Sequence, residues 1–154
     1  MLYFLSKKKK ELSIKSYPEK DLLRNKKNTN RIYYIKHRNI KKYWGNILTL
    51  LTNKKGAVKI INMKNNTQSS MEFHINKKES YYINFGKLYL GLRYGRAKQK
   101  IIKLNKNNVF LMKPGTMHMR MSKNDTNIIE MCTADSNNDS IIVHDGKKYK
   151  FYEE

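Results

Sequence analysis

Residues 70–86 read Ser-Met-Glu-Phe-His-Ile-Asn-Lys-Lys-Glu-Ser-Tyr-Tyr-Ile-Asn-Phe-Gly, and this stretch is the most informative about the fold class. Its first half alternates between apolar side chains and side chains that can bind a metal. The apolar set is Met71, Phe73 and Ile75, and the other set is Glu72, His74 and Asn76. Alternation with a period of two is typical of a β-strand with one buried face, so all members of a set share one side.

Segments of the same kind continue on both sides of this stretch, separated by turn residues such as Gly, Asn and Pro. The predicted strands are 47–51, 57–61, 70–76, 81–85, 87–94, 100–104, 109–112, 117–121 and 127–132. Many short strands at a spacing of about 8–12 residues indicate an all-β sandwich or barrel. Asn105–Asn108 supplies a turn whose residues tolerate a positive φ.

The first 42 residues have a different composition, dense in Lys and Arg and poor in apolar pattern. Within them, residues 11–23 predict a short helix and residues 31–35 a short strand. We therefore expect a basic N-terminal extension over residues 1–42 and a β domain over residues 43–154.

The chain carries 33 Lys and Arg against 12 Asp and Glu, a net charge of +21. Clustered cations release counterions from phosphates, which predicts polyanion binding and, in one hypothesis, a nucleic-acid-binding protein led by the basic first part. The other interpretation is a compositional bias, because Lys, Asn, Ile and Tyr are abundant throughout and Lys far outnumbers Arg. Under that interpretation, polyanion binding is weak and non-specific.

Cysteine content and hydropathy favour a cytoplasmic location. A single cysteine, Cys132, excludes an intrachain disulfide framework and suits a reducing compartment. No apolar run approaches the roughly 20 residues that span a bilayer. The apolar start precedes the Lys7–Lys10 run, the reverse of a secretory signal. We expect no membrane partner.

Two histidines and a glutamate form a candidate metal site. His74 and Glu79 lie on either side of Lys77-Lys78. The turn at Lys113-Pro-Gly115 brings His118 onto another strand, with Arg120 on the same face. Imidazole and carboxylate from converging strands suit a divalent first-row metal. Glu72 or Asn76 could add a fourth ligand. The alternative is that each histidine is a lone polar residue, satisfied by the backbone in a β interior.

Two motifs resemble those of the cupin family. The run His74-x-Asn76-x-x-Glu79, followed by six residues and Gly86, resembles the first motif, H-x-H-x(3,4)-E-x(6)-G, with Asn for the second His and a shorter gap. The run Lys113-Pro-Gly-Thr-Met-His118 resembles the second motif, P-x-G-x-x-H-x(3)-N, with Lys113 at the Pro position and Ser122 at the Asn position.

Further segments are similar to the type II phosphomannose isomerases, including the isomerase-like domain of mannose-1-phosphate guanylyltransferases. Tyr43-Trp44-Gly45 resembles R-P-W-G, and 69–74 resembles S-L-Q-M-H. Likewise, 77–81 resembles R-x-E-H-W and 139–145 resembles D-D-I-V-R-x-x-D. The resemblance covers about residues 43–150.

The resemblance implies a double-stranded β-helix with a divalent metal in its open mouth: zinc first, with manganese, iron, cobalt and nickel as alternatives. It implies His74, Glu79 and His118 as ligands, with Glu72 where the family has a Gln ligand. The implied reaction is aldose–ketose isomerisation of a sugar phosphate, with a nucleotide sugar as an alternative ligand. Glu72 is then the candidate base, and Arg120 the candidate phosphate-binding cation, with Arg93 and Arg96 as further candidates.

A non-catalytic sugar-binding or interaction domain is the alternative, because Asn76 and Ser80 depart from the family pattern. By analogy with cupins that pair through an edge strand, a homodimer is also expected.

Overall fold

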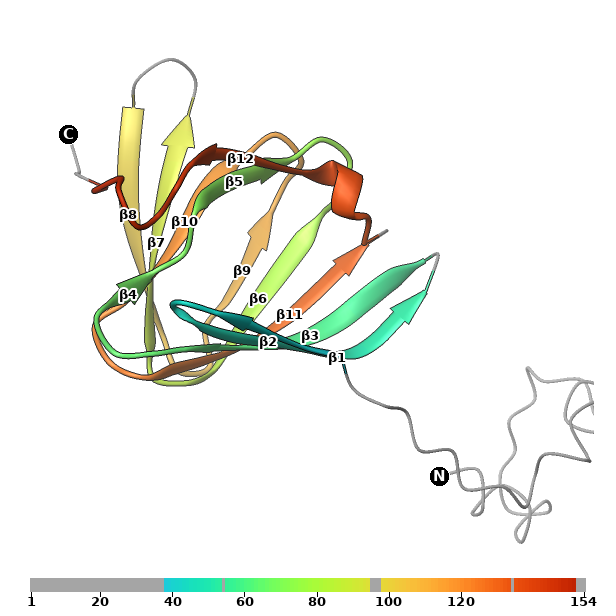
Figure 1. Ribbon diagram of the computed structural model, residues 1–154, viewed down its shortest axis with the longest axis horizontal. Coiled ribbons are helices and arrows are strands. Elements are labelled where there is room, and N and C mark those ends of the chain that lie inside the picture. Colours follow the sequence, from blue (N-terminus) through green and yellow to red (C-terminus); the bar gives the residue numbers. More distant parts are fainter. Residues whose placement is uncertain (1–37, 54, 95–97, 134, 152–154) are drawn as a thin grey trace, which may run out of the picture. The chain divides into compact units, whose positions relative to one another are not determined.

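The computed structural model describes residues 38–53, 55–94, 98–133 and 135–151, and these form two facing antiparallel β-sheets (Figure 1). The sequence order of the strands is β1 (Arg38–Lys42), β2 (Gly45–Asn53), β3 (Gly56–Met63), β4 (Thr67–Gln68), β5 (Met71–His74), β6 (Glu79–Phe85), β7 (Lys87–Tyr94), β8 (Lys98–Asn105), β9 (Val109–Met112), β10 (Met117–Ser122), β11 (Thr126–Thr133) and β12 (Ser140–His144). A 3-10 helix, η2 (Asn137–Asp139), precedes β12.

One sheet has the order β1-β2-β3-β11-β6-β9 and the other the order β12-β5-β10-β7-β8, with β4 also paired to β10. Strands distant in sequence therefore lie side by side, as β3 does with β11 and β5 with β10. This all-β, two-sheet arrangement is the predicted double-stranded β-helix. All nine predicted strands are present, although the strand predicted over 70–76 ends at His74.

The core lies between the sheets and follows the period-two patterns of the strands. In β6, Glu79, Tyr81 and Ile83 are buried while the residues between them are less so. Tyr81 and Ile83 pack with apolar side chains from both sheets, including Ile61, Leu90 and Ile128. Trp44 joins the same cluster and is 4% exposed, which makes it a core residue. The inner face of β6 thus carries Glu79 directly beside the apolar core.

Three of the described strands were not predicted: β1, β4 and β12. β1 lies within the segment assigned to the basic extension, yet it pairs along its whole length with β2. The described sheet thus already includes residues 38–42, while the division of the chain into extension and domain remains a prediction. The predicted helix at 11–23 and the predicted strand at 31–35 lie outside the described residues. Among the residues that the structure describes, no helix has the length and apolarity to cross a bilayer.

Turn residues hold the strand ends as their backbone preferences predict. Asn107 has φ 69°, and its N–H donates to the carbonyl oxygen of Ile83 at 2.8 Å. Gly115 has φ 77°, and its N–H donates to the carbonyl oxygen of His74 at 2.6 Å. This second bond fastens the turn before β10 to the end of β5, and so brings the two candidate metal-binding strands together.

Candidate metal centre

The two imidazoles of the site come from neighbouring strands. In the antiparallel pairing of β10 with β5, His118 lies opposite Glu72, and His74 follows two residues later on the same strand. The His74 and His118 rings are 5.6 Å apart between centroids, and both side chains are almost fully buried. The structure therefore brings together three of the predicted ligands from segments more than 40 residues apart in sequence.

Each imidazole is oriented by a backbone carbonyl. His74 Nδ1 lies 2.8 Å from the carbonyl oxygen of Asp139, and His118 Nδ1 lies 3.0 Å from that of Thr116. A carbonyl oxygen can only accept, so each Nδ1 carries a proton, and each ring in its neutral form presents the lone pair of Nε2. Metal-ligating histidines are commonly held in this way.

The carboxylate of Glu79 lies between the two Nε2 atoms. Its Oε1 is 3.3 Å from His74 Nε2, and its Oε2 is 3.4 Å from His118 Nε2. Two donors that each lie about 2.1 Å from one ion, at angles of about 90–109°, are about 3.0–3.4 Å apart. The spacing of these atoms thus suits a shared cation.

His74 Nε2 is buried and has no hydrogen-bond partner among the described residues. A buried lone pair without a partner is costly unless something is bound there. A second carboxylate, Glu72, also lies close, since one ligand atom each from Glu72, His74 and His118 fall within 4.8 Å of one another. Two imidazoles with carboxylates are a donor set for zinc and for manganese, iron, cobalt or nickel, so the residues present fit the implied metal.

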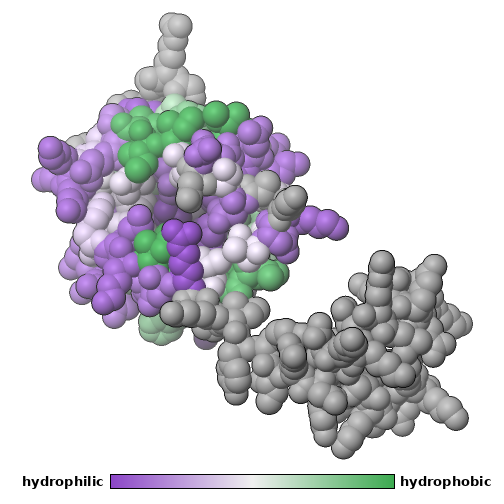
Figure 2. Space-filling view, turned by 45° about the vertical axis from the view of Figure 1, so that its right-hand side comes forward, coloured by the Kyte–Doolittle hydropathy of each residue, from purple (hydrophilic) through white to green (hydrophobic). Residues whose placement is uncertain are grey.

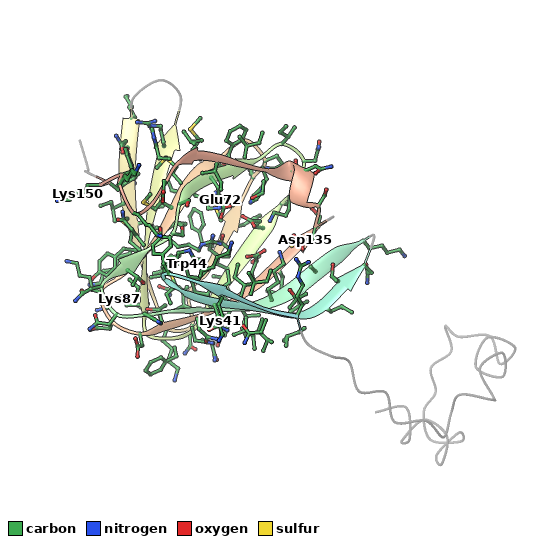
Figure 3. The ribbon with its side chains drawn as sticks, viewed as in Figure 1. Lys41, Trp44, Glu72, Lys87, Asp135 and Lys150 are labelled. Atoms are coloured by element: carbon green, nitrogen blue, oxygen red, sulfur yellow. The ribbon has the colours of Figure 1, made fainter. Side chains whose placement is uncertain are left out.

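Both carboxylate oxygens of Glu72 accept hydrogen bonds from protein groups. Its Oε1 accepts from Arg120 Nη2 at 2.5 Å, and its Oε2 accepts from the Ser140 hydroxyl at 2.9 Å. Arg120 Nη1 also donates to the Tyr81 hydroxyl at 2.9 Å, and the guanidinium lies over the Trp44 ring at 5.6 Å. Figure 3 shows Trp44 and Glu72 facing the space between the sheets. Arg120 is therefore within the site. Its two terminal nitrogens are bound by protein groups, whereas its Nε is buried and has no hydrogen-bond partner among the described residues.

A second layer of charges surrounds Glu79, and the sequence patterns did not reveal it. Lys77 Nζ lies 2.7 Å from Glu79 Oε1, and 3.8 Å from the buried Glu130 on β11. Lys59 Nζ, on β3, lies 3.5 Å from Glu130 and 2.7 Å from Asp135. The alternation of β11 was a usable signal, because Glu130 occupies the same inward face as Ile128.

The acid–base behaviour of the centre follows from burial and these charges. Burial favours neutral Glu79, but the neighbouring His74, His118 and Lys77 outweigh it and hold the carboxyl pKa well below its usual range. Burial lowers the pKa of His118. At His74 burial has the same effect, yet the contact with Glu79 outweighs it and raises the pKa. Burial raises the pKa of Glu130, and the nearby Glu79 adds to this.

Part of the centre lies in the wall of a pocket of about 240 Å³, and His118 is not among the residues that line it. Its lining includes Glu72, His74, Glu79 and Arg120 from the site, together with Trp44 and residues of β1 and β2. This volume is somewhat below the roughly 300–1,000 Å³ of typical ligand sites, which suits a small metabolite.

Asn76 does not join the other predicted ligands. β5 ends at His74, and the backbone N–H groups of Ile75, Asn76 and Lys77 all donate to the Asp139 carboxylate at 2.8–3.2 Å. This turn leaves the Asn76 side chain exposed. The prediction assumed that the alternation of side chains continues past His74. The turn bound by the Asp139 carboxylate ends that alternation.

A different register of the first cupin motif matches this geometry. The motif's full spacing is matched when Glu72 takes the place of the first His and His74 that of the second. Four residues then separate His74 from Glu79, and six separate Glu79 from Gly86. Of the other predicted cations, Arg93 lies on β7 and is not among the pocket residues, and Arg96 lies outside the described residues.

No protein-family model matches the sequence, and no curated protein matches it either. Solved structures do match. The capsular polysaccharide assembling protein CapF from Staphylococcus aureus has a TM-score of 0.64 and 16% identity over 73% of this chain and 33% of that chain. Oxalate decarboxylase from Bacillus subtilis has a TM-score of 0.61 and 12% identity over 70% of this chain and 30% of that chain.

These neighbours are cupin-fold proteins, and at such identities the likeness shows the fold alone: this chain has the double-stranded β-helix fold. The chain spans about a third of the length of the solved structures that it matches.

Proposed function

We propose that this chain is a metal-dependent enzyme that isomerises a sugar phosphate between its aldose and ketose forms, as the resemblance to type II phosphomannose isomerases implies. The observation that carries the proposal is the meeting of two Nε2 lone pairs with the Glu79 carboxylate in the wall of a small pocket. Of the structural neighbours, one assembles capsular polysaccharide and the other decarboxylates oxalate, so proteins of this fold handle both sugars and small anions.

His74, Glu79 and His118 would hold the metal, with Glu72 beside them. A bound divalent cation polarises sugar oxygens and stabilises negative charge that develops on them. Lys77, bound to Glu79 Oε1 at 2.7 Å, fixes the orientation of that carboxylate. The Asp139 and Thr116 carbonyls fix the tautomers of the two imidazoles.

Glu72 would be the residue that moves the proton. Burial favours its neutral form, but Arg120 and His118 outweigh burial and lower its pKa, so Glu72 is a carboxylate at neutral pH. It would accept the proton from C2 of the aldose and return it to C1, while the hydroxyl proton on O2 is lost and O1 gains one. Arg120 acts on the reaction through Glu72, as a positioning residue.

The second candidate is a non-catalytic domain that binds the same ligand. The observation that favours it is the salt bridge between Glu72 and Arg120, because a carboxylate with a lowered pKa is a weak base. Both candidates share the metal and the pocket, and they differ only in turnover.

Metal analysis and an activity assay separate these cases. Purified wild type is expected to hold about one divalent ion per chain, and His118→Ala to lose it, whereas His144→Ala is the matched control outside the cluster. Interconversion of mannose 6-phosphate and fructose 6-phosphate is then followed with zinc, manganese, cobalt or nickel added. Equal metal in wild type and His118→Ala would remove the site. Ligand binding without turnover would favour the non-catalytic candidate.

A further inference from the structure

The strand β1 presents two cations to the pocket. In the pairing of β1 with β2, Ile40 lies opposite Ile47, which packs against the core cluster, so Ile40 is on the inner side. Alternation places Arg38 and Lys42 on that side as well, and all three residues line the pocket.

The cations deeper in the pocket are already paired, whereas those of β1 are not. Lys59 lies 2.7 Å from Asp135, Lys77 lies 2.7 Å from Glu79, and Arg120 lies 2.5 Å from Glu72. Arg38 and Lys42 are exposed, and neither has a salt-bridge partner among the described carboxylates.

The net charge of the pocket favours binding of an anion. Its lining has five cationic side chains and four carboxylates, so the formal excess is one positive charge before any metal is counted. A divalent ion would raise that excess to three. An excess of this size favours a dianionic group, and the unpaired cations mark where it would bind.

The backbone and side chains hold β1 in place, so its two cations are positioned in advance. A chain of asparagine amides fastens it from the outer face of the sheet. Asn46 Nδ2 donates to Asn39 Oδ1 at 3.0 Å, Asn62 Nδ2 to Asn46 Oδ1 at 3.3 Å, and Asn127 Nδ2 to Asn62 Oδ1 at 2.6 Å. These bonds tie β1 through β2 and β3 to β11, whose Glu130 lines the pocket.

We propose that Arg38 and Lys42 form the phosphate-binding subsite of the pocket and select an organic phosphate over the free sugar. The proposal rests on the proposed function for the other end of the ligand, which would reach the centre at His74, Glu79 and His118. Arg38 supplies a planar fork of donors and Lys42 a point charge, both suited to phosphate oxygens.

The test compares the double variant Arg38→Gln/Lys42→Gln with Lys41→Gln/Lys64→Gln. The control also removes two cations. Lys41 and Lys64 line a hollow that Lys42 also borders, but neither lines the pocket of the metal centre, and Figure 3 shows Lys41 on the outer side of the sheet. Binding of mannose 6-phosphate, mannose and inorganic phosphate to metal-loaded protein is measured by calorimetry, with metal content checked in every variant.

The inner double variant is expected to bind mannose 6-phosphate and inorganic phosphate at least about tenfold more weakly, with unchanged metal content and unchanged binding of mannose. The control variant should behave as wild type. Equal losses in both variants, no loss in either, or no phosphate binding by wild type would overturn the subsite. If wild type binds inorganic phosphate at this subsite but shows neither isomerase activity nor sugar binding, the proposed function fails while the subsite stands.

Discussion

Arg120 holds the Glu72 carboxylate of the centre in place. It donates to Glu72 and to the Tyr81 hydroxyl, and it packs on Trp44 while remaining 5% exposed. Removing one partner of a buried ion pair leaves the other charge uncompensated, which costs more than the pair itself contributes.

Arg120→Met is therefore expected to lower the free energy of unfolding by about 3 kcal/mol, because Glu72 loses its partner in a buried site. Arg120→Met/Glu72→Gln should recover a large part of that loss, since the amide still accepts from Ser140 without a charge. Urea unfolding of the two single variants and the double variant measures the coupling. Strictly additive losses would show that the two side chains do not interact.

Metal retention should depend on pH through His74, because a proton and a metal compete for Nε2. Burial disfavours the charged ring, but Glu79 outweighs it and raises the pKa of His74 above its ordinary value, so this imidazole binds protons more readily than His118. We expect metal to be retained at about pH 8 and to be released progressively as the pH is lowered and His74 binds a proton. The metal-to-protein ratio after dialysis at stepped pH measures this, and retention unchanged to about pH 5 would argue against imidazole ligands.

Sequence spacing, together with the resemblance to the two cupin motifs, predicted His74, Glu79 and His118 as ligands, whereas each histidine taken alone would also suit a β interior. It could not place Asn76, since the turn that exposes this residue depends on Asp139, 63 residues further along the chain. Glu130 and Lys59 were missed for the related reason that their partners lie on other strands.

At the scale of the strands, tight turns decide which segments can pair. Gly86 joins β6 to β7, and Gly115 lies in the turn before β10. Both are left-handed, with φ 79° and φ 77°, so an alanine at either position is strained by a similar amount. They differ in space, because a Cβ at Gly86 would lie 2.3 Å from the carbonyl oxygen of Asp125, whereas one at Gly115 would meet nothing within 4 Å.

This pair separates backbone strain from steric clash. Gly115→Ala is expected to cost about 1 kcal/mol of unfolding free energy, the penalty of the left-handed conformation. Gly86→Ala should cost about 3 kcal/mol or more, because the Asp125 backbone must also move. Thermal and urea unfolding of both variants give the comparison, and equal losses would show that the turn at Gly86 relaxes freely.

Period-two alternation was sufficient for the central strands, because each buries one face. It failed for β1 and β12, which lie at the edges of the two sheets. Ile40 is the one apolar residue of β1, and it pairs with Ile47 on the inner side of the sheet. The other residues of β1 are charged or polar, so its sequence shows no alternation that would predict a strand. The contribution of β1 becomes visible only once pairing with β2 places its cations at the pocket.

At the scale of the whole molecule, we expect the surface charge and the pocket to bind different partners. The face in Figure 2 is mainly hydrophilic, with apolar side chains in separate patches. The charge of +21 is spread over the chain, whereas the anion subsite uses two cations at one position. Long polyanions are therefore expected to bind the surface in general, and small phosphates to bind the pocket.

Oligonucleotide binding should consequently be weak, independent of base sequence and strongly dependent on salt. Counterion release predicts a loss of affinity of at least about tenfold between about 50 and 200 mM salt. Fluorescence anisotropy with unrelated single-stranded and duplex oligonucleotides measures this, with mannose 6-phosphate as the comparison ligand. Arg38→Gln/Lys42→Gln should change oligonucleotide affinity little, because it removes 2 of the 33 Lys and Arg residues, while it abolishes the phosphate subsite. Tight, sequence-dependent and salt-resistant binding would instead favour a nucleic-acid function for the chain, since non-specific surface charge cannot produce it.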